Sequence, residues 1–240
     1  MFVITADQID SRHDHDRARE MIGHLLAQAP HAFSLPPDQT AGDEIQLLVS
    51  AARPALDAIL ALHRSGHWSI GLGVGTVRTP LPESTRQATG EAFIAARDAV
   101  TRAKRTEAHF ALEVEADASD TIETATGIEA LVTMLLLLRQ RRTPAGWQAG
   151  DLFETGMAQT SIARTLGVTT GAVSQRLKAA QYRVDQAARP ALIRLLEQLD
   201  RGPNDPAGPE ANSHQSVPGA MNADAMNTNA TNTNEMDSSA

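Results

Sequence analysis

The sequence predicts an α+β fold, in which a ferredoxin-like or palm-like domain of sheet and helices precedes an all-α domain with a helix-turn-helix. Strand-like apolar runs alternate with helical spacings over residues 1–117. Over residues 118–200 the apolar residues show only the spacing of helices. The 240 residues are 42% hydrophobic and 21% charged, a composition typical of a globular protein with room for two domains.

The first domain is predicted to hold its elements in the order β-α-β-β-α-β and then α-β. Each strand is a short apolar or alternating run, and each helix places its apolar residues on one side. This order predicts a sheet with antiparallel strands and helices on one face. The predicted strands are 2–6, 32–35, 45–50, 68–77 and 109–114, and the predicted helices are 17–29, 54–66 and 90–104.

A glycine run within the fourth predicted strand has a period of two. Gly71, Gly73 and Gly75 fall on one face, whereas apolar side chains fall on the other. Close packing of a helix against the glycine face explains this pattern, and close approach of a ligand is the alternative.

The second domain begins with an apolar helix at 122–142, which is a candidate for an interdomain or dimer contact. From residue 202 onward Pro, Gly, Asn, Ser and Thr dominate, so residues 201–240 are predicted to be a disordered tail. The remaining predicted helices are 148–155, 159–166, 170–183 and one from Arg189 or Pro190 to 199.

Residues 159–180 are predicted to form the helix-turn-helix. Gly167 breaks the first helix, and Thr169 can cap the second. The alternative is a helical hairpin that packs only within the protein. The residues predicted to share a core beneath the two helices are Ile162, Ala163, Leu166, Val173 and Leu177.

The second helix of this motif presents polar residues on its outer side. Thr169 and Thr170 at its start suit contacts with DNA phosphates. Ser174, Gln175 and Lys178 suit base edges, since glutamine can pair bidentately with adenine. The arginines predicted to contact the DNA backbone or an intradomain partner are Arg164, Arg176 and Arg183.

The distribution of charge favours double-stranded DNA as the partner, although the net charge is −8. Residues 139–189 hold eight basic and three acidic residues, and the rest of the chain is acidic. Aromatic residues make up only 3%, which argues against recognition by base stacking. The chain has no cysteine, which excludes disulfides, thiol catalysis and cysteine-bound metal sites.

Acidic residues follow two strands that are predicted to be neighbours. Asp7 follows the first strand, and Asp43 and Glu44 precede the third. Two carboxylates at adjacent strand ends can hold a hard cation such as Mg²⁺. The alternative is that Asp7 and Asp10 cap the following helix.

Four blocks of the first domain together resemble the SatD family of bacterial proteins, in the same order. The blocks are residues 6–12, 42–46, 70–75 and 90–97. Members often carry a carboxy-terminal helix-turn-helix, and the segment here is similar to MarR-like and sigma-factor region 4 types. This resemblance implies a DNA-binding or regulatory role.

The same blocks more distantly resemble the palm-like class III nucleotidyl cyclases. That resemblance implies metal carboxylates at Asp7 and Asp43, the late-helix arginine at Arg97, and a nucleotide or metal pocket that includes Glu44. The chain departs from the pattern at Phe93, where those enzymes have asparagine, and at Pro36-Pro37. Ala6 and Ile45 also replace the glycine and phenylalanine usual in the SatD pattern. These departures argue against cyclase activity.

These observations together predict a cytoplasmic, DNA-binding transcriptional regulator that acts as a homodimer on two half-sites. Its first domain would dimerise or sense a nucleotide-like small-molecule effector, and DNA binding would need no cofactor. No membrane contact is expected, because the longest apolar run, 131–138, ends at Arg139. The alternative is a Mg²⁺-dependent nucleotide-binding protein or degenerate cyclase-like enzyme.

Overall fold

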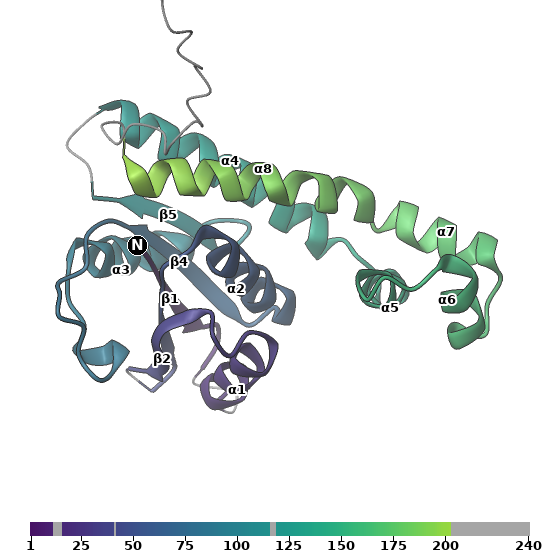
Figure 1. Ribbon diagram of the computed structural model, residues 1–240, viewed down its shortest axis with the longest axis horizontal. Helices are drawn as coiled ribbons and strands as arrows, with labels where there is room; N and C mark the ends of the chain where they lie inside the picture. Colours follow the sequence, from purple (N-terminus) through teal and green to yellow (C-terminus); the bar gives the residue numbers. More distant parts are fainter. Residues whose placement is uncertain (12–15, 41, 116–118, 203–240) are drawn as a thin grey trace, which may run out of the picture. The chain divides into compact units, whose positions relative to one another are not determined.

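The computed structural model describes residues 1–11, 16–40, 42–115 and 119–202, and within them the fold is α+β, as predicted. A five-stranded mixed sheet is accompanied by eight α-helices in these residues (Figure 1). The strands are β1 (Phe2–Gln8), β2 (Phe33–Gln39), β3 (Glu44–Val49), β4 (Trp68–Val74) and β5 (Phe110–Val114). The helices are α1 (Ala18–Gln28), α2 (Ala52–Ser65), α3 (Glu91–Ala103), α4 (Ser119–Gln140), α5 (Pro144–Glu154), α6 (Gln159–Leu166), α7 (Thr170–Ala179) and α8 (Tyr182–Arg201), with a 3-10 turn, η1 (Thr85–Gln87).

The strands lie in the order β2-β3-β1-β4-β5. β1 is central and antiparallel to both β3 and β4, so that Ile4 faces Leu47 on one side and Leu72 on the other. β2 pairs antiparallel with β3, and β5 pairs parallel with β4. The parallel pair follows from the connection through α3, because parallel neighbours need a crossover.

The two faces of the sheet are covered by different helices. Large apolar side chains such as Phe2 and Phe110 pack with α1, α2, α4 and α8 in one core. α3 covers the other face, so the prediction that the helices lie on one face was wrong. An added Cβ at Gly71 or Gly73 would lie 2.2 Å from a backbone atom of α3. The glycine face therefore admits this helix, and close packing is the explanation that holds.

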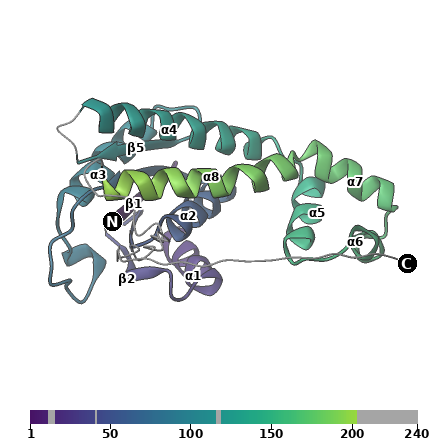
Figure 2. The same ribbon diagram turned by 45° about the horizontal axis from the view of Figure 1, so that its top comes forward.

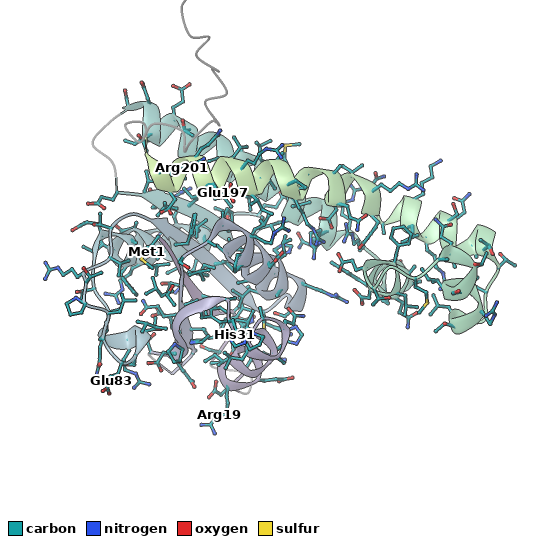
Figure 3. All side chains as sticks on the ribbon, in the orientation of Figure 1. Met1, Arg19, His31, Glu83, Glu197 and Arg201 are labelled. Carbon is teal, nitrogen blue, oxygen red and sulfur yellow. The ribbon has the colours of Figure 1, made fainter. Side chains whose placement is uncertain are left out.

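The long helices α4 and α8 lie side by side and complete the core of the sheet (Figures 1 and 2). Ile128 and Val132 of α4 and Leu196 of α8 are at most 2% exposed and belong to the same cluster as the strands. Glu197 and Arg201 mark the last turns of α8 in Figure 3. Both helices were predicted to belong to the second domain, yet they share the core of the sheet.

Several predicted boundaries shift for local reasons. β2 continues through Pro36-Pro37 with register shifts, which an edge strand tolerates because one side of its backbone needs no ladder partner. α8 begins at Tyr182 and contains Pro190, and the helix break falls at Gln181, whose φ is 51°. The predicted disordered tail lies, from residue 203 on, outside the described residues.

By length and composition alone, α4 could also span a membrane. One of its sides is buried against the sheet and α8, and 28% of its most apolar window is buried within the described residues.

Candidate nucleic-acid interface

The connection between α6 and α7 has the features predicted for it. Gly167 ends α6 in the left-handed conformation, with φ of 64°. The N–H of Val168 donates to the carbonyl of Ala163 at 3.0 Å, which closes the end of α6. The hydroxyl of Thr169 accepts a hydrogen bond from the N–H of Ala172 at 3.1 Å, so Thr169 caps α7.

A small apolar cluster lies beneath α6 and α7. Four of the five predicted core residues, Ile162, Ala163, Val173 and Leu177, are buried there, and Leu166 packs against them partly exposed. α5 and the start of α8 also contribute to this cluster, which the sequence did not predict, through Ala149, Leu152, Phe153 and Tyr182. The rings of Phe153 and Tyr182 meet edge to face with centroids 5.6 Å apart.

Above this cluster, α7 exposes most of the side chains predicted to contact DNA. Thr170, Ser174 and Lys178 follow one another at intervals of four residues, and Gln175 lies beside them. Thr169 is also exposed, whereas Arg176 is only partly exposed at the edge of this face. We call Thr169, Thr170, Ser174, Gln175 and Lys178 the polar face of α7.

A shallow depression of about 330 Å³ lies beside the polar face of α7. Its lining includes Ser174 and Lys178 from α7, and Gln181 and Arg183 from the start of α8. Arg164 of α6 is exposed as well. The exposed cations of this region thus come from three helices, and Arg164 and Arg183 are among the residues predicted to contact the DNA backbone or an intradomain partner.

A buried carboxylate connects α4 and the following loop to α8. Asp185 is fully buried and accepts hydrogen bonds from Arg139 at 2.5 Å, Arg142 at 2.7 Å and Arg189 at 2.7 Å. Burial alone would raise the pKa of Asp185, but the hydrogen bonds and charges of the arginines outweigh it and lower the pKa to about 2. These four residues are called the Asp185 cluster.

Trp147 of α5 joins the same region through its ring. The guanidinium carbons of Arg64, Arg139 and Arg142 lie 4.2, 4.9 and 4.8 Å from the ring centroid. Arg64 of α2 also forms a bidentate ion pair with Asp151 of α5, at 2.8 and 2.7 Å. These contacts hold α5, and through it α6 and α7, against α2 and α4.

The acidic strand ends lie at one end of the sheet but do not form a cluster of three ligands within the described residues. Asp7 and Glu44 are register partners on β1 and β3, so their side chains share one face. Asp7 is ion-paired with Lys104 at 2.8 Å, and the carboxylate of Glu44 accepts from the hydroxyl of Thr40 at 2.5 Å. The carbonyl of Asp43, immediately before β3, accepts from the N–H of Gln8.

Arg97, the remaining predicted ligand residue, lies on the exposed side of α3. Among the described residues, neither the depression beside α7 nor the cavity along α1 and α2 nor a third cavity beside His63 is lined by Arg97 or by any of the acidic strand-end residues. The nucleotide or metal pocket therefore stays a prediction. The structure brings Asp7 and Glu44 together, whereas Arg97 lies on the exposed side of α3.

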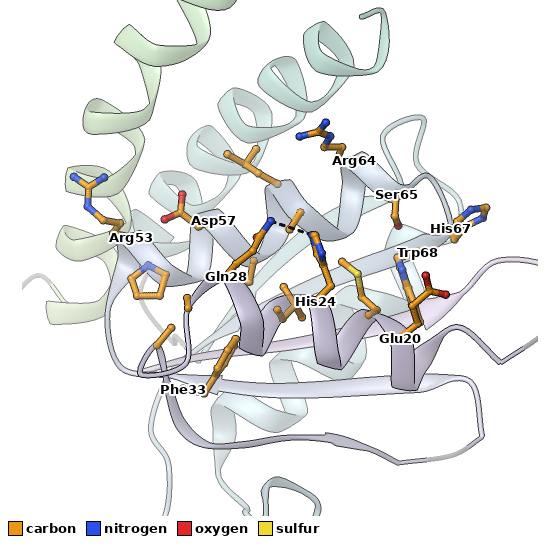
Figure 4. Close-up of a pocket in the computed structure, with 18 of the residues that line it drawn as sticks. Glu20, His24, Gln28, Phe33, Arg53, Asp57, Arg64, Ser65, His67 and Trp68 are labelled. Carbon is orange, nitrogen blue, oxygen red and sulfur yellow. Dashed lines mark hydrogen bonds between the residues drawn. The ribbon is translucent and has the colours of Figure 1, made fainter. Parts of the chain in front are cut away.

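The largest of these three cavities was not predicted. It has a volume of about 900 Å³ and lies along α1 and α2 (Figure 4), where Gln28 and His24 are hydrogen-bonded at 3.0 Å. Arg53 and Asp57 of α2 line it, and burial raises the pKa of Asp57. Its lining residues come from several helices that are far apart in the sequence, so no local pattern indicates it.

No protein-family model, curated protein or solved structure matches this chain.

Proposed function

We propose that this protein is a cytoplasmic, DNA-binding transcriptional regulator that places α7 in the major groove. α6, the Gly167 turn and α7 would form the helix-turn-helix. The observation that carries the proposal is the exposed polar face of α7, which stands on a buried apolar cluster and begins at a capped amino terminus. Backbone N–H groups at such a terminus suit a phosphate, and the following turns suit base edges.

The distribution of positive charge supports this proposal. Arg139, Arg142 and Arg189 bind Asp185, so they are not available to DNA. The exposed cations nearest α7 are Lys178 and Arg183, with Arg164 on α6. Phosphate contacts by these side chains would make binding depend on salt concentration.

We also assign the sheet to the ferredoxin-like or palm-like arrangement. The order β2-β3-β1-β4, with β1 antiparallel to both neighbours, supports this assignment, and β5 would be an added edge strand. Under the same proposal, the four sequence blocks described above would place the chain with the SatD family.

The experiment is fluorescence anisotropy with DNA enriched from a random pool. We expect Lys178→Ala to weaken binding and to lower its dependence on salt concentration, because the variant has one cation fewer at the DNA surface. Gln175→Ala should relax selectivity at one base pair, worth about 1–3 kcal/mol. The matched controls are Arg194→Ala and Gln198→Ala, which remove one cation and one side-chain amide from the exposed side of α8. Equal losses in both sets of variants would contradict a specific role for α7.

A second candidate is Mg²⁺-dependent nucleotide binding in a pocket that includes Asp7, Asp43 and Glu44. It is supported by the register pairing of Asp7 with Glu44, which gathers carboxylates at adjacent strand ends. Lys104 competes with a cation, because its ammonium group lies 2.8 Å from the Asp7 carboxylate. Calorimetric titration with Mg²⁺ and nucleoside triphosphates should therefore show tighter binding for Lys104→Met and no binding for Asp7→Ala. Absence of heat in the unmodified protein and in Lys104→Met would remove this candidate.

A further inference from the structure

α4 carries an apolar stripe on the side that faces away from the sheet. Leu131 is 45% exposed and Met134 is 67% exposed, and Leu138 is partly exposed. Together with Gly127 they follow intervals of four, three and four residues, which is the spacing of a coiled-coil seam. The opposite side of α4 is buried in the core, so the helix has two apolar sides and only one is covered within the described residues.

Gly127 is not required by the packing of the described chain. A Cβ added there would meet no atom within 4 Å, and glycine inside a helix is less favourable than alanine. An outside helix that approaches closely would make use of the missing side chain. The stripe therefore has a residue without a side chain, Gly127, at one end and a residue with a large side chain, Leu138, at the other.

We propose that α4 pairs with α4 of a second copy of this chain, antiparallel, about a two-fold axis between Leu131 and Met134. In this register Leu131 packs against Met134 of the second copy, and Leu138 fills the space left at Gly127. The surface is self-complementary, as a two-fold interface requires. Knobs from each helix enter holes on the other.

The charges at the two ends of α4 favour a second copy in this direction. Asp120 and Glu123 are exposed in the first turns, and Arg141 is exposed immediately after the last. Antiparallel pairing places the acidic residues near the arginine of the second copy, whereas parallel pairing places like charges together. The helix dipoles also oppose each other in this arrangement.

The pairing does not depend on the proposed DNA binding, because it concerns α4 and not α7. In this register Gln140, the last residue of α4, lies opposite Ala125 of the second copy, so the carboxyl ends of the two α4 helices would lie ~20 Å apart along the helix axes. Such a dimer would present two copies of α7 from opposite ends of the helix pair, but self-association can be measured without DNA.

The first test is sedimentation equilibrium of the full chain over a range of concentrations. Met134→Glu should raise the dimer dissociation constant at least tenfold, because it buries a carboxylate in the seam. The matched control is Ile122→Glu, since Ile122 is also on α4 and 49% exposed but points to another side of the helix. A monomeric unmodified protein, or equal effects of the two substitutions, would overturn the proposal.

A second variant distinguishes specific pairing of α4 from nonspecific apolar association and from binding to a lipid surface. Gly127→Leu adds apolar area and helix propensity, so binding to any unspecific apolar partner should increase. In the proposed register the new side chain collides with Leu138 of the second copy, and the dimer should weaken at least tenfold. Tighter self-association of Gly127→Leu, or binding of the monomer to neutral phosphatidylcholine vesicles that Met134→Glu abolishes, would overturn the proposal.

The direction of pairing is tested by cross-linking, which the absence of cysteine makes simple. Leu131→Cys and Met134→Cys are prepared as separate proteins and treated with a short bismaleimide. The mixture should give cross-linked dimers with one copy of each, and neither protein alone should cross-link as efficiently. Efficient cross-linking of each alone, without the mixed product, would indicate parallel pairing and overturn the proposed register.

Discussion

α3 and the α5–α7 helices are held in place by opposite kinds of chemistry. α3 lies against a face of the sheet from which side chains are missing at Gly71 and Gly73, and its own contacts are made largely by alanines. The α5–α7 helices are held by the Asp185 cluster and by arginines stacked on Trp147. The attachment of α3 depends chiefly on shape, with ion pairs of the exposed Arg102 only at its end, and the attachment of the α5–α7 helices depends chiefly on buried charges.

This difference has a consequence for the orientation of α7. Apolar packing is largely non-directional, whereas an arginine and a carboxylate pair in a fixed geometry. Arg142 donates both to Asp185 and to the carbonyl of Ala180, at the end of α7. The buried charges therefore fix where α7 ends and α8 begins, and with it the direction of the polar face of α7.

The largest expected effect is a loss of stability at the glycine face of the sheet, on which α3 packs. Gly73→Val would place side-chain atoms where the backbone of α3 lies, since even a Cβ would come within 2.2 Å of the Ala92 carbonyl oxygen. We expect a loss of more than about 4 kcal/mol, or no folded protein, in urea unfolding followed by circular dichroism. Gly23→Ala is the control, because a Cβ at this exposed position of α1 meets nothing, and it should add about 0.5–1 kcal/mol. A folded Gly73→Val protein with unchanged stability would mean that α3 does not pack on the glycines.

The second largest expected loss of stability comes from a substitution in the Asp185 cluster, which holds the α5–α7 helices. Asp185→Ala would leave Arg139 and Arg142 buried without their carboxylate partner, which typically costs about 3–5 kcal/mol. Asp151→Ala removes an ion pair whose partners are 44% and 42% exposed, so its cost should be no more than about 1 kcal/mol. Urea unfolding of both variants measures the contrast. Similar losses for the two would show that the Asp185 cluster acts as an ordinary surface pair.

These two attachments differ in how far they could be predicted from the sequence. The glycine strand and α3 follow from local periods of two and of 3.6 residues, and the turn before α7 follows from Gly167 and Thr169. The Asp185 cluster could not be predicted, because Arg139 and Asp185 are 46 residues apart and no local pattern pairs them. The side of the sheet that α3 covers also depends on the crossover to β5, which the order of elements alone left open.

The start of α8 is a second feature that the local sequence could not predict. Pro190 suggested a helix beginning at residue 189 or 190, because proline is favoured in a first turn. The helix begins at Tyr182 instead, and the packing of Tyr182 at one end and of Leu192 and Leu196 at the other outweighs the cost of an internal proline. Tertiary contacts of this kind leave no signal in the local sequence.

The smallest of the three expected effects concerns pH. His63 of α2 lines a cavity with Arg139, His109 and Trp147, beside the charged attachment. Burial, together with the charges of Arg139 and His109, lowers the pKa of His63 from 6.5 to about 4. A group whose folded pKa is lowered stabilises the protein above its unfolded pKa, so this contribution is lost as the pH falls from about 6.5 to 4.

We therefore expect the unfolding free energy to fall by roughly 2–3 kcal/mol more across this range in the unmodified protein than in His63→Gln. Asp185 should contribute only at lower pH, between about 4 and 2, because its pKa is lowered from 3.8. Urea titrations at several pH values and constant ionic strength measure the difference. His31→Gln, at an exposed histidine, should keep the full pH dependence. If His63→Gln also kept the full pH dependence of the unfolding free energy, groups other than His63 would cause the loss of stability in acid. The attachment by the Asp185 cluster would then be no more sensitive to pH than the glycine face of the sheet.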